Sequence, residues 1–350
     1  MTMGIDPGSR FWKFCVIDDD GILSRDKIDT AKITRDGAAF RGELERNLDG
    51  LEAIAAPSGH GLSLTTIDRV GREDVQKMTL KRGGPSIVGL GSSIEILRDV
   101  CSETGIKCFV LPSVKHLNSV PPWRKINRVD LGTADKVCSA AYALQSLSDR
   151  RSQPLAETSF ILADVGHAFL AMVCVEKGRI VDGIGGTMAG FGTGASGAID
   201  AELVHSWEFP DRSSIYSGGL VHAAGLSLQE IEDRLPGELE ERPSVALRRF
   251  LESFASDAAA MSTRNDVGEV VLSSVLGPRL NSLLIEEVTR VGLPVKHSMV
   301  DEGPGCIGAA YVANGLIGGR YSGLVKHLGI DSGRGSIMDK IYFHGEPRIR

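Results

Sequence analysis

The sequence predicts an α/β protein with two domains of related fold. Its 350 residues are enough for two domains, and a hydrophobic content of 42% with nearly balanced charges excludes a disordered chain. The 42 glycines gather at the ends of apolar runs, where α/β proteins use them in tight strand-to-helix turns. A strand pattern at the N-terminus also recurs in the middle of the chain, and a repeat with so long a period predicts two similar domains.

The first copy of this pattern is a three-stranded meander at the N-terminus. A short strand ends at Asp6, and the turn Pro7-Gly8-Ser9 leads into an apolar strand that contains residues 14–17. A second turn, which ends at Gly21, leads into a third strand. The order is therefore strand, acidic turn, strand, turn, strand.

The second copy begins at Ser159. An apolar strand leads to Asp164, a turn follows, residues 168–175 form a continuous apolar strand, and a turn at Gly178 precedes a third strand. Asp164 lies 158 positions after Asp6, and Gly178 lies 157 positions after Gly21. The two copies thus coincide within one residue.

Helical spacing of apolar residues and short apolar runs predict the remaining elements. A polar stretch that ends at Pro154 predicts the boundary between an N-terminal domain (residues 1–150) and a C-terminal domain (151–330), with a polar tail over 331–350. We expect helices over residues 41–55, 93–101, 133–147, 228–235, 244–261, 280–291 and 305–315, and strands over 107–111 and 269–272.

Composition excludes several classes of protein. With 39 Lys and Arg against 45 Asp and Glu, the net charge of −6 argues against a general nucleic-acid coat or a polybasic membrane binder. The N-terminus lacks a signal-peptide pattern, and the longest apolar run, residues 168–175, is too short to span a membrane. The six cysteines include no C-x-x-C pair and several lie in apolar runs, which is typical of buried thiols in a reducing compartment. We therefore expect a soluble, cytoplasmic protein.

The acidic turns suit a phosphate and metal site. A carboxylate at the end of a strand can hold a hydrated Mg²⁺, and the amides of a following glycine turn can face phosphate oxygens. A single Asp-x-Gly is usually only a hairpin turn. Two such turns at equivalent positions, at Asp6 and Asp164, can grip one polyphosphate from two sides.

Four further segments follow one another along the chain: Ile5-Asp6-Pro7-Gly8-Ser9, Ala163-Asp164-Val165-Gly166-His167, the glycine-rich stretch over residues 185–201 and the strand, turn and helix over 270–280. In this order they resemble the phosphate and adenosine motifs of the superfamily that contains acetate and sugar kinases, Hsp70 and actin. Within the superfamily the chain is most similar to an archaeal family labelled predicted butyrate kinases. That likeness lies in Ala56-Pro57-Ser58-Gly59-His60-Gly61-Leu62, Asp130-Leu131-Gly132-Thr133-Ala134-Asp135-Lys136 and Gly186-Thr187-Met188-Ala189-Gly190.

The resemblance implies two ribonuclease-H-like domains with mixed sheets and a central cleft, which close over ATP for phosphoryl transfer. It places Mg²⁺ at Asp6, Asp164 and the late acidic residue Glu302. It places the nucleotide on those two aspartates and on Gly8, Ser9, Gly166, His167, Gly185, Gly186, Thr187, Ser273, Ser274 and Gly277. The superfamily usually has paired glycines where this chain has Ser273-Ser274, so we expect the sugar and base to be held differently.

The acceptor implied by the resemblance is a small carboxylate, so the expected activity is that of an ATP- and Mg²⁺-dependent phosphotransferase. A cation should stabilise the acceptor and the transferring group. Lys136 lies with Arg124, Lys125 and Arg128 near the start of a predicted helix, and Asp135 can orient one of them or act as a base. Solvation of the helix surface explains Asp135-Lys136 equally well.

Two other functions stay open. The segment over residues 4–10 also resembles the opening strand of RuvC-type resolvases, although the acidic charge and the repeat at Asp164 count against a nuclease. A non-catalytic ATP-binding regulator or scaffold of the same fold is favoured by Ser273-Ser274 and by the absence of an unambiguous catalytic base. The expected partner is a small-molecule substrate, and a homodimer is left open.

Overall fold

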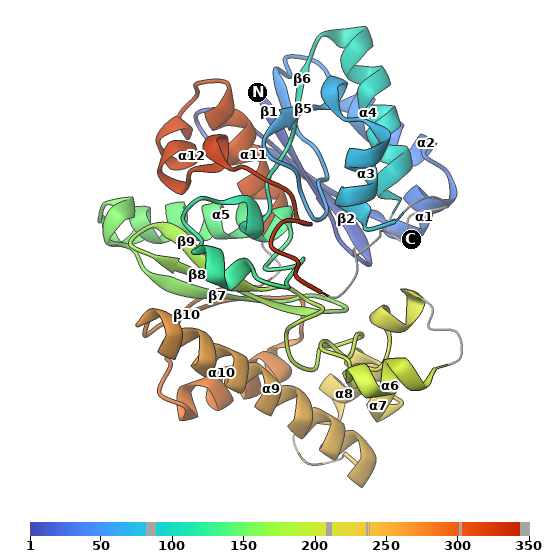
Figure 1. Cartoon of the computed structure of the whole chain (residues 1–350), viewed down its shortest axis with the longest axis vertical. Coiled ribbons are helices and arrows are strands. Elements are labelled where there is room, and N and C mark those ends of the chain that lie inside the picture. Colours follow the sequence, from blue (N-terminus) through green and yellow to red (C-terminus); the bar gives the residue numbers. More distant parts are fainter. Residues whose placement is uncertain (82–88, 208–211, 236, 238, 301–302, 344–350) are drawn as a thin grey trace. The chain divides into compact units, whose positions relative to one another are not determined.

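The structure is a computed structural model that describes residues 1–81, 89–207, 212–235, 237, 239–300 and 303–343 (Figure 1). Contacts within the chain divide it into two compact units. Unit 1 contains Met1–Thr158, Lys177–Asp182 and Gly303–Arg350, and unit 2 contains Ser159–Glu176 and Gly183–Glu302. The domain limits predicted from the sequence, at residues 150 and 330, stay predictions.

Unit 1 is built on a six-stranded mixed sheet with the order β3-β2-β1-β4-β6-β5. The first three strands form the predicted antiparallel meander, whereas β4 and β6 run parallel to β1. The strands are β1 (Thr2–Pro7), β2 (Phe11–Ile17), β3 (Ile22–Asp29), β4 (Ala53–Ala55), β5 (Thr65–Thr66) and β6 (Lys107–Val110).

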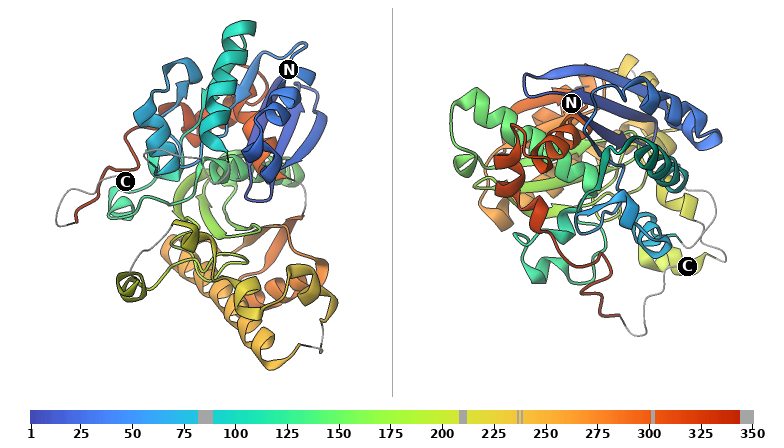
Figure 2. Two further views of the ribbon diagram at one scale, coloured as in Figure 1. Left: turned by 90° about the vertical axis from the view of Figure 1, so that its right-hand side faces the viewer. Right: turned by 90° about the horizontal axis from the view of Figure 1, so that it is seen from above.

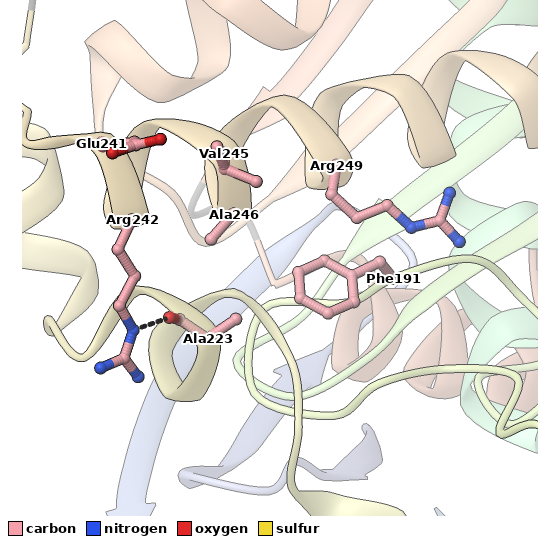
Figure 3. Close-up of a pocket in the computed structure, with 7 residues that line it drawn as sticks. All are labelled: Phe191, Ala223, Glu241, Arg242, Val245, Ala246 and Arg249. Carbon is pink, nitrogen blue, oxygen red and sulfur yellow. Dashed lines mark hydrogen bonds between the residues drawn. The ribbon is translucent and has the colours of Figure 1, made fainter. Parts of the chain in front are cut away.

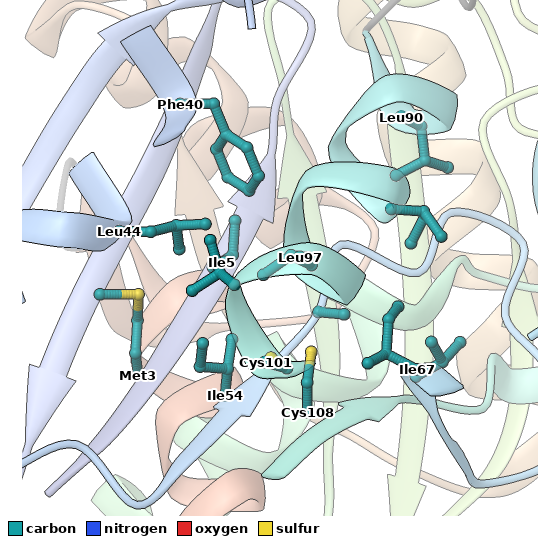
Figure 4. Close-up of a cluster of buried hydrophobic side chains, with 14 of the residues drawn as sticks. Met3, Ile5, Phe40, Leu44, Ile54, Ile67, Leu90, Leu97, Cys101 and Cys108 are labelled. Carbon is teal, nitrogen blue, oxygen red and sulfur yellow. The ribbon is translucent and has the colours of Figure 1, made fainter. Parts of the chain in front are cut away.

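Helices cover both faces of this sheet (Figures 1 and 2). Alternate residues of β1 point to opposite faces: Met3 and Ile5 join the core under α2 and α4 (Figure 4), and Gly4 faces α11. A Cβ at Gly4 would lie 2.1 Å from the Cys306 carbonyl oxygen, so a glycine is required for this helix to approach the strand. The helices are α1 (Thr30–Arg35), α2 (Ala38–Arg46), α3 (Arg72–Thr79), α4 (Leu90–Thr104), α5 (Ala134–Arg151), α11 (Pro304–Leu316) and α12 (Ser322–Leu328).

Unit 2 is built on a five-stranded sheet with the order β11-β10-β7-β8-β9. β7 and β8 are antiparallel, and β10 and β11 continue the sheet in parallel with β7. Phe250 and Phe254 of α9 are buried, and α9 packs on β7 and β8. The elements are β7 (Phe160–Val165), β8 (Leu170–Glu176), β10 (Val270–Ser274), β11 (Val295–Val300), α6 (Ala201–Ser206), α7 (Leu220–Ala224), α8 (Leu228–Asp233), α9 (Glu241–Asn265) and α10 (Pro278–Arg290). The edge strand β9 (Arg179–Ile184) completes the sheet, and its residues up to Asp182 are counted with unit 1.

The predicted α/β class with two mixed sheets is confirmed. The helix predicted over residues 41–55 is wrong in its second half, because α2 ends at Arg46 and Ala53–Ala55 forms β4. All three residues of β4 are buried between β1 and β6. A short apolar run that is buried on both sides cannot be told from a buried helix by its spacing.

The described residues after Ile330, 331–343, for which the sequence predicts no structure, pack within unit 1. The Arg334 N–H donates to the His116 carbonyl oxygen over 2.9 Å, and the Lys115 ammonium donates to the Ile337 carbonyl oxygen. Ile337 is buried. Among the described helices, none is both long enough and apolar enough to span a bilayer.

Candidate functional site

Asp6 lies at the end of β1, beside the first turn of α11. A Cβ at Gly305 would lie 2.5 Å from Asp6 Oδ2, so only glycine allows the start of this helix to approach the carboxylate so closely. The positive end of the helix dipole favours a negative charge there. The meander places Lys13 of β2 directly opposite Asp6.

Lys13 is a residue that the sequence analysis missed. Its side chain is half-buried and also approaches Gly303, where a Cβ would lie 3.5 Å from Lys13 Cδ. The signal that would have identified it is the register of the predicted hairpin, since Asp6 and Lys13 flank its turn symmetrically.

Asp135, in the first turn of α5, forms an ion pair with its neighbour Lys136. Lys136 Nζ lies 2.7 Å from Asp135 Oδ2, and the Thr133 hydroxyl donates to Asp135 Oδ1. Burial raises the pKa of Asp135, but the Lys136 ammonium and these hydrogen bonds outweigh it and hold the pKa below its ordinary value. Asp135 is therefore ionised at neutral pH.

The charges of Asp6 and Asp135 both affect the pKa of one buried thiol, that of Cys138. Burial raises the pKa of Cys138 well above its ordinary value, and the negative charges of Asp135 and Asp6 raise it further. The pKa of Cys306 is raised by a hydrogen bond with Cys15, by burial and by the charge of Asp6. The structure thus brings the two predicted acidic residues of unit 1 into one neighbourhood.

A small pocket of about 10 Å³, enough for roughly one water molecule, lies at the carboxyl ends of β1, β4 and β6. Ligands of open α/β sheets bind at this edge. Ser58 Oγ donates to the Ala56 carbonyl over 2.8 Å and accepts the Leu111 N–H over 2.9 Å. The pocket is lined by Ile5, Pro7, Ala56, Ser58, Gly59, Leu111, Ala134, Asp135, Cys138 and Ala309. Residues 56–62 and 130–136, two motifs that carry the butyrate kinase resemblance, therefore meet in one pocket.

The other predicted cations of unit 1 are engaged elsewhere. Arg124 donates to the Val181 carbonyl over 2.9 Å and lies 3.6 Å from the Asp182 carboxylate. Lys125 Nζ donates to the Leu117 carbonyl over 2.8 Å, and the Arg128 carbonyl accepts from Lys115. The structure joins Lys136 to Asp135, but it places Arg124 and Lys125 in contacts that hold the segment over residues 114–128.

In unit 2, Asp164 and Ser273 lie side by side on β7 and β10. Ser273 Oγ donates to Asp164 Oδ1 over 3.2 Å, and the two residues pair in register. The following turn is closed by the Gly166 N–H, which donates to the Phe169 carbonyl over 2.9 Å. Ser274 instead accepts the Leu276 N–H within its own loop. The His167 carbonyl oxygen packs against Gly194 of the glycine-rich stretch, where an added Cβ would lie 3.0 Å from it.

The glycine-rich stretch packs against its own unit, so it is not a flexible linker. A Cβ at Gly186 would lie 2.6 Å from the Phe169 ring, and one at Gly192 would lie 2.6 Å from the Ala168 carbonyl oxygen. The Gly190 N–H donates to Asp257 Oδ2 over 2.6 Å. The predicted contacts of Gly185, Gly186 and Thr187 with a nucleotide stay predictions.

Glu232 occupies the start of α10, within the predicted adenosine motif. Its carboxylate accepts the backbone N–H groups of Arg279 over 2.7 Å and Leu280 over 3.0 Å, and it is 7% exposed. A Cβ at Gly277 would lie 2.4 Å from Glu232 Cδ. The N–H groups at a helix start can bind an anionic ligand, but here two of them already donate to the Glu232 carboxylate. No local pattern could have identified Glu232, because it comes from α8.

Glu302, predicted to bind Mg²⁺, and its neighbour Asp301 lie outside the described residues. Among the residues that are described, no group of three or more His, Cys, Asp or Glu side chains is placed to hold a metal ion. Asp6 belongs to unit 1 and Asp164 to unit 2, so each acidic turn is described within its own unit.

Solved structures of small-molecule kinases are similar to this chain. A propionate kinase from Francisella tularensis matches with a TM-score of 0.65 and 12% identity over 88% of this chain and 97% of its own. Acetate kinases from Entamoeba histolytica (13% identity, 83% of this chain, 86% of its own) and Porphyromonas gingivalis (13%, 87% and 97%) each have a TM-score of 0.60. At such identities the likeness shows the fold alone, an α/β fold with two mixed sheets that this chain shares with these kinases.

Comparison with curated protein sequences gives no match. A family model described as "Protein of unknown function (DUF1464)" matches residues 4–343. The match includes both acidic turns, the pocket of unit 1 and the glycine-rich stretch. Because it extends over nearly the whole chain, the protein belongs to the DUF1464 family.

Proposed function

We propose that the protein is an ATP- and Mg²⁺-dependent phosphotransferase that acts on a small molecule. The observation that carries this proposal is the pocket of unit 1, which Asp135 and Cys138 line and where the charges of both Asp6 and Asp135 act on the Cys138 thiol. Phosphoryl transfer needs mainly positioning and electrostatic stabilisation, which such a site supplies. The fold shared with acetate and propionate kinases supports the same reaction class.

Mg²⁺ fits the acidic turns. This ion is usually held by one or two carboxylates together with phosphate oxygens and water, so a cluster of three protein ligands is not required. Asp6, close to Gly305, and Asp164, held by Ser273, would each supply a carboxylate. When bound, the ion neutralises charge on the phosphate oxygens of ATP. Glu302 is retained as a proposed third ligand.

The chain offers backbone groups for the phosphates of ATP, but the segment expected to bind the adenosine is partly occupied by Glu232. The turns at Gly8-Ser9 and Gly166-His167 follow the two carboxylates directly, so their backbones are proposed to meet the phosphates. The start of α10 is occupied by Glu232 and cannot also donate its N–H groups to a nucleotide. Ser273 positions Asp164, and Gly277 makes room for Glu232, which supports a base and sugar held differently from those of the superfamily.

Three side chains of unit 1 would act on the transferring group and the acceptor. Lys13, opposite Asp6, would neutralise the charge that develops on the phosphoryl group. Asp135 accepts a proton or orients the acceptor, and Lys136 keeps Asp135 ionised. Ile5, Leu111 and Ala309 give the pocket an apolar wall beside Asp135.

The acceptor proposed from the resemblance to butyrate kinases is a small carboxylate. A hydroxyl acceptor is the second candidate, and Asp135 is the observation that favours it. An ionised Asp135 would repel a carboxylate but would take the proton of a hydroxyl group. The nearest predicted cation, Lys136, is already paired with Asp135, and Arg124 lies against Asp182.

The test is ATP consumption by the full-length chain with Mg²⁺ against short-chain carboxylates, sugars and polyols. Trapping of acyl phosphate as a hydroxamate identifies a carboxylate acceptor. We expect Asp6→Asn and Asp135→Asn to reduce turnover by about 100-fold or more. Asp26→Asn, a control at an exposed position of β3, should leave turnover unchanged.

Two outcomes would replace the proposal. If the protein binds Mg–ATP tightly but consumes it with none of these acceptors, the chain is a nucleotide-binding regulator. If it cleaves four-way DNA junctions, the resolvase alternative is correct.

A further inference from the structure

A pocket of about 530 Å³ lies in unit 2, between α7, the first turns of α9 and the glycine-rich stretch (Figure 3). This volume is typical of small-molecule sites. The pocket has apolar walls formed by Phe191, Ala223, Val245 and Ala246. It is separate from the pocket of unit 1, and the proposed phosphotransferase activity does not use it.

Two arginines of α9 line this pocket. Arg242 is fixed at the end of α7, because its Nε donates to the Ala223 carbonyl over 2.7 Å and its Nη2 donates to the His222 carbonyl over 3.2 Å. Within the described residues, the guanidinium of Arg249 makes no hydrogen bond or ion pair. In Figure 3 it extends beyond the Phe191 ring. The two arginines lie seven positions apart and thus on one face of the helix.

The acidic groups nearby do not neutralise these two charges. Among the described residues of the lining, Glu241 is the single acidic one, at the first position of α9. Asp257, further along the same helix, is bound to the Gly190 N–H over 2.6 Å. Burial raises the pKa of Asp257, whereas that N–H and the charges of Arg264 and Arg249 lower it in part. The lining therefore keeps an excess of positive charge beside an apolar wall.

We propose that this pocket binds a small organic oxyanion, a carboxylate or phosphate ester that carries an apolar group. The apolar group contacts Phe191, Val245 and Ala246, and the oxyanion is bound by Arg249, while Arg242, held at the end of α7, adds positive charge to the lining. A guanidinium matches the planar geometry of a carboxylate or phosphate, and its weak hydration suits a partly apolar site. The apolar walls select against inorganic anions.

Phe191 connects the pocket to the acidic turn of unit 2 through the residues next to it in the chain. Gly192, the next residue, lies against Ala168 in the turn that follows Asp164, where a Cβ would be 2.6 Å from the carbonyl oxygen. On the other side of Phe191, Gly190 is anchored to Asp257. A ligand that contacts Phe191 therefore touches a segment that is held against the Asp164 turn.

The experiment is a ligand-observed NMR titration of the full-length chain with benzoate, phenyl phosphate, neutral benzamide and inorganic phosphate. We expect benzoate and phenyl phosphate to bind at least about tenfold more tightly than benzamide or inorganic phosphate. Arg249→Gln and Phe191→Ala should each weaken benzoate binding by about tenfold. Arg249 is exposed and makes no bond within the described residues, so its substitution should leave the fold intact.

Two control variants show whether benzoate binds at this pocket and not elsewhere on the chain. Arg248→Gln changes the adjacent arginine, which pairs with Glu287 of α10 over 3.2 Å and does not line the pocket, so benzoate affinity should be unchanged. Asp135→Asn alters the pocket of unit 1 and should also leave it unchanged. The proposal is overturned if no organic anion binds up to about 10 mM, if Arg249→Gln retains full affinity, or if Asp135→Asn abolishes binding.

Discussion

The two acidic turns have the same secondary structure but different surroundings. Each carboxylate lies near the end of the first strand of a meander, yet the residue directly opposite Asp6 is Lys13, whereas the residue opposite Asp164 is Ala171. Asp6 is approached by the start of α11, and Asp164 by the hydroxyl of Ser273 on a neighbouring strand. The repeat thus preserves the carboxylate and changes what stabilises its charge.

For the proposed phosphotransferase reaction, we expect this difference to give the two units different roles. Unit 1 combines a carboxylate with a cation, a helix start and the Asp135–Lys136 pair, which are groups that act on developing charge. Unit 2 supplies a carboxylate and a neutral hydrogen-bond donor, which suits positioning. We therefore expect substitutions at equivalent positions to affect turnover mainly in unit 1 and nucleotide affinity in unit 2.

The largest expected effect is at Lys13. Lys13→Met should lower kcat by about 100- to 1000-fold, because it removes the positive charge directly opposite Asp6, a position that Ala171 occupies opposite Asp164. Steady-state kinetics with the acceptor found in the screen would measure it. Lys32→Met, an exposed lysine of α1, is the control. A drop in kcat no larger than that of Asp164→Asn would contradict these different roles.

The approach of α11 to Asp6 predicts the next effect. Gly305→Ala places a Cβ 2.5 Å from the Asp6 carboxylate, so the carboxylate or the helix must shift at a cost of about 1–3 kcal/mol. Calorimetry should show a loss of Mg–ATP affinity of about tenfold. Gly323→Ala, in α12, meets nothing within 4 Å and should be neutral or slightly stabilising. Equal behaviour of the two variants would rule out this role for Gly305.

Acid should affect the two units in opposite directions. Burial lowers the pKa of His116 in unit 1 from about 6.5 to about 4, with Lys125 and Lys115 adding to the shift. Between these values the unfolded chain binds the extra proton and the folded chain does not, so stability falls as the pH falls from 6.5 to 4, by at most about 3 kcal/mol. Burial raises the pKa of Asp257 in unit 2, so the folded chain holds this proton more tightly than the unfolded chain does. The contribution of Asp257 to stability is therefore present at low pH and is lost as the pH rises through its pKa.

Thermal unfolding at several pH values measures this effect. The wild-type Tm should fall as the pH is lowered through that window, and His116→Gln should remove most of the slope. A variant with an unchanged slope would show that another group is responsible. The contact of Arg334 with the His116 carbonyl predicts that the segment after Ile330 is released first, which limited proteolysis would detect.

The smallest expected effect is at the neutral donor of unit 2. Ser273→Ala removes one hydrogen bond to Asp164, which is worth about 0.5–1.5 kcal/mol, so Mg–ATP affinity should fall by less than about tenfold with little change in kcat. Ser282→Ala, an exposed serine of α10, provides the comparison. If Ser273→Ala abolishes turnover, the hydroxyl does more than position the carboxylate.

The sequence by itself determined the α/β class, both meanders and the two acidic turns. These features are local: strands alternate with turns within about 25 residues, and a carboxylate followed by a glycine turn can be read directly. It also located Asp135 and Lys136 at a helix start, where the structure finds them paired. Local spacing was insufficient for β4, because three buried residues carry no periodicity.

Only the tertiary structure decided what each carboxylate touches. Gly305 reaches Asp6 from 299 positions away, Glu232 reaches the start of α10 from another helix, and Arg124 is drawn to Asp182. Such contacts are made when strands and helices that are distant in the sequence pack face to face. The residues around a charged side chain in the sequence do not specify which distant helix will pack against it. This part of the site therefore follows from the tertiary structure alone.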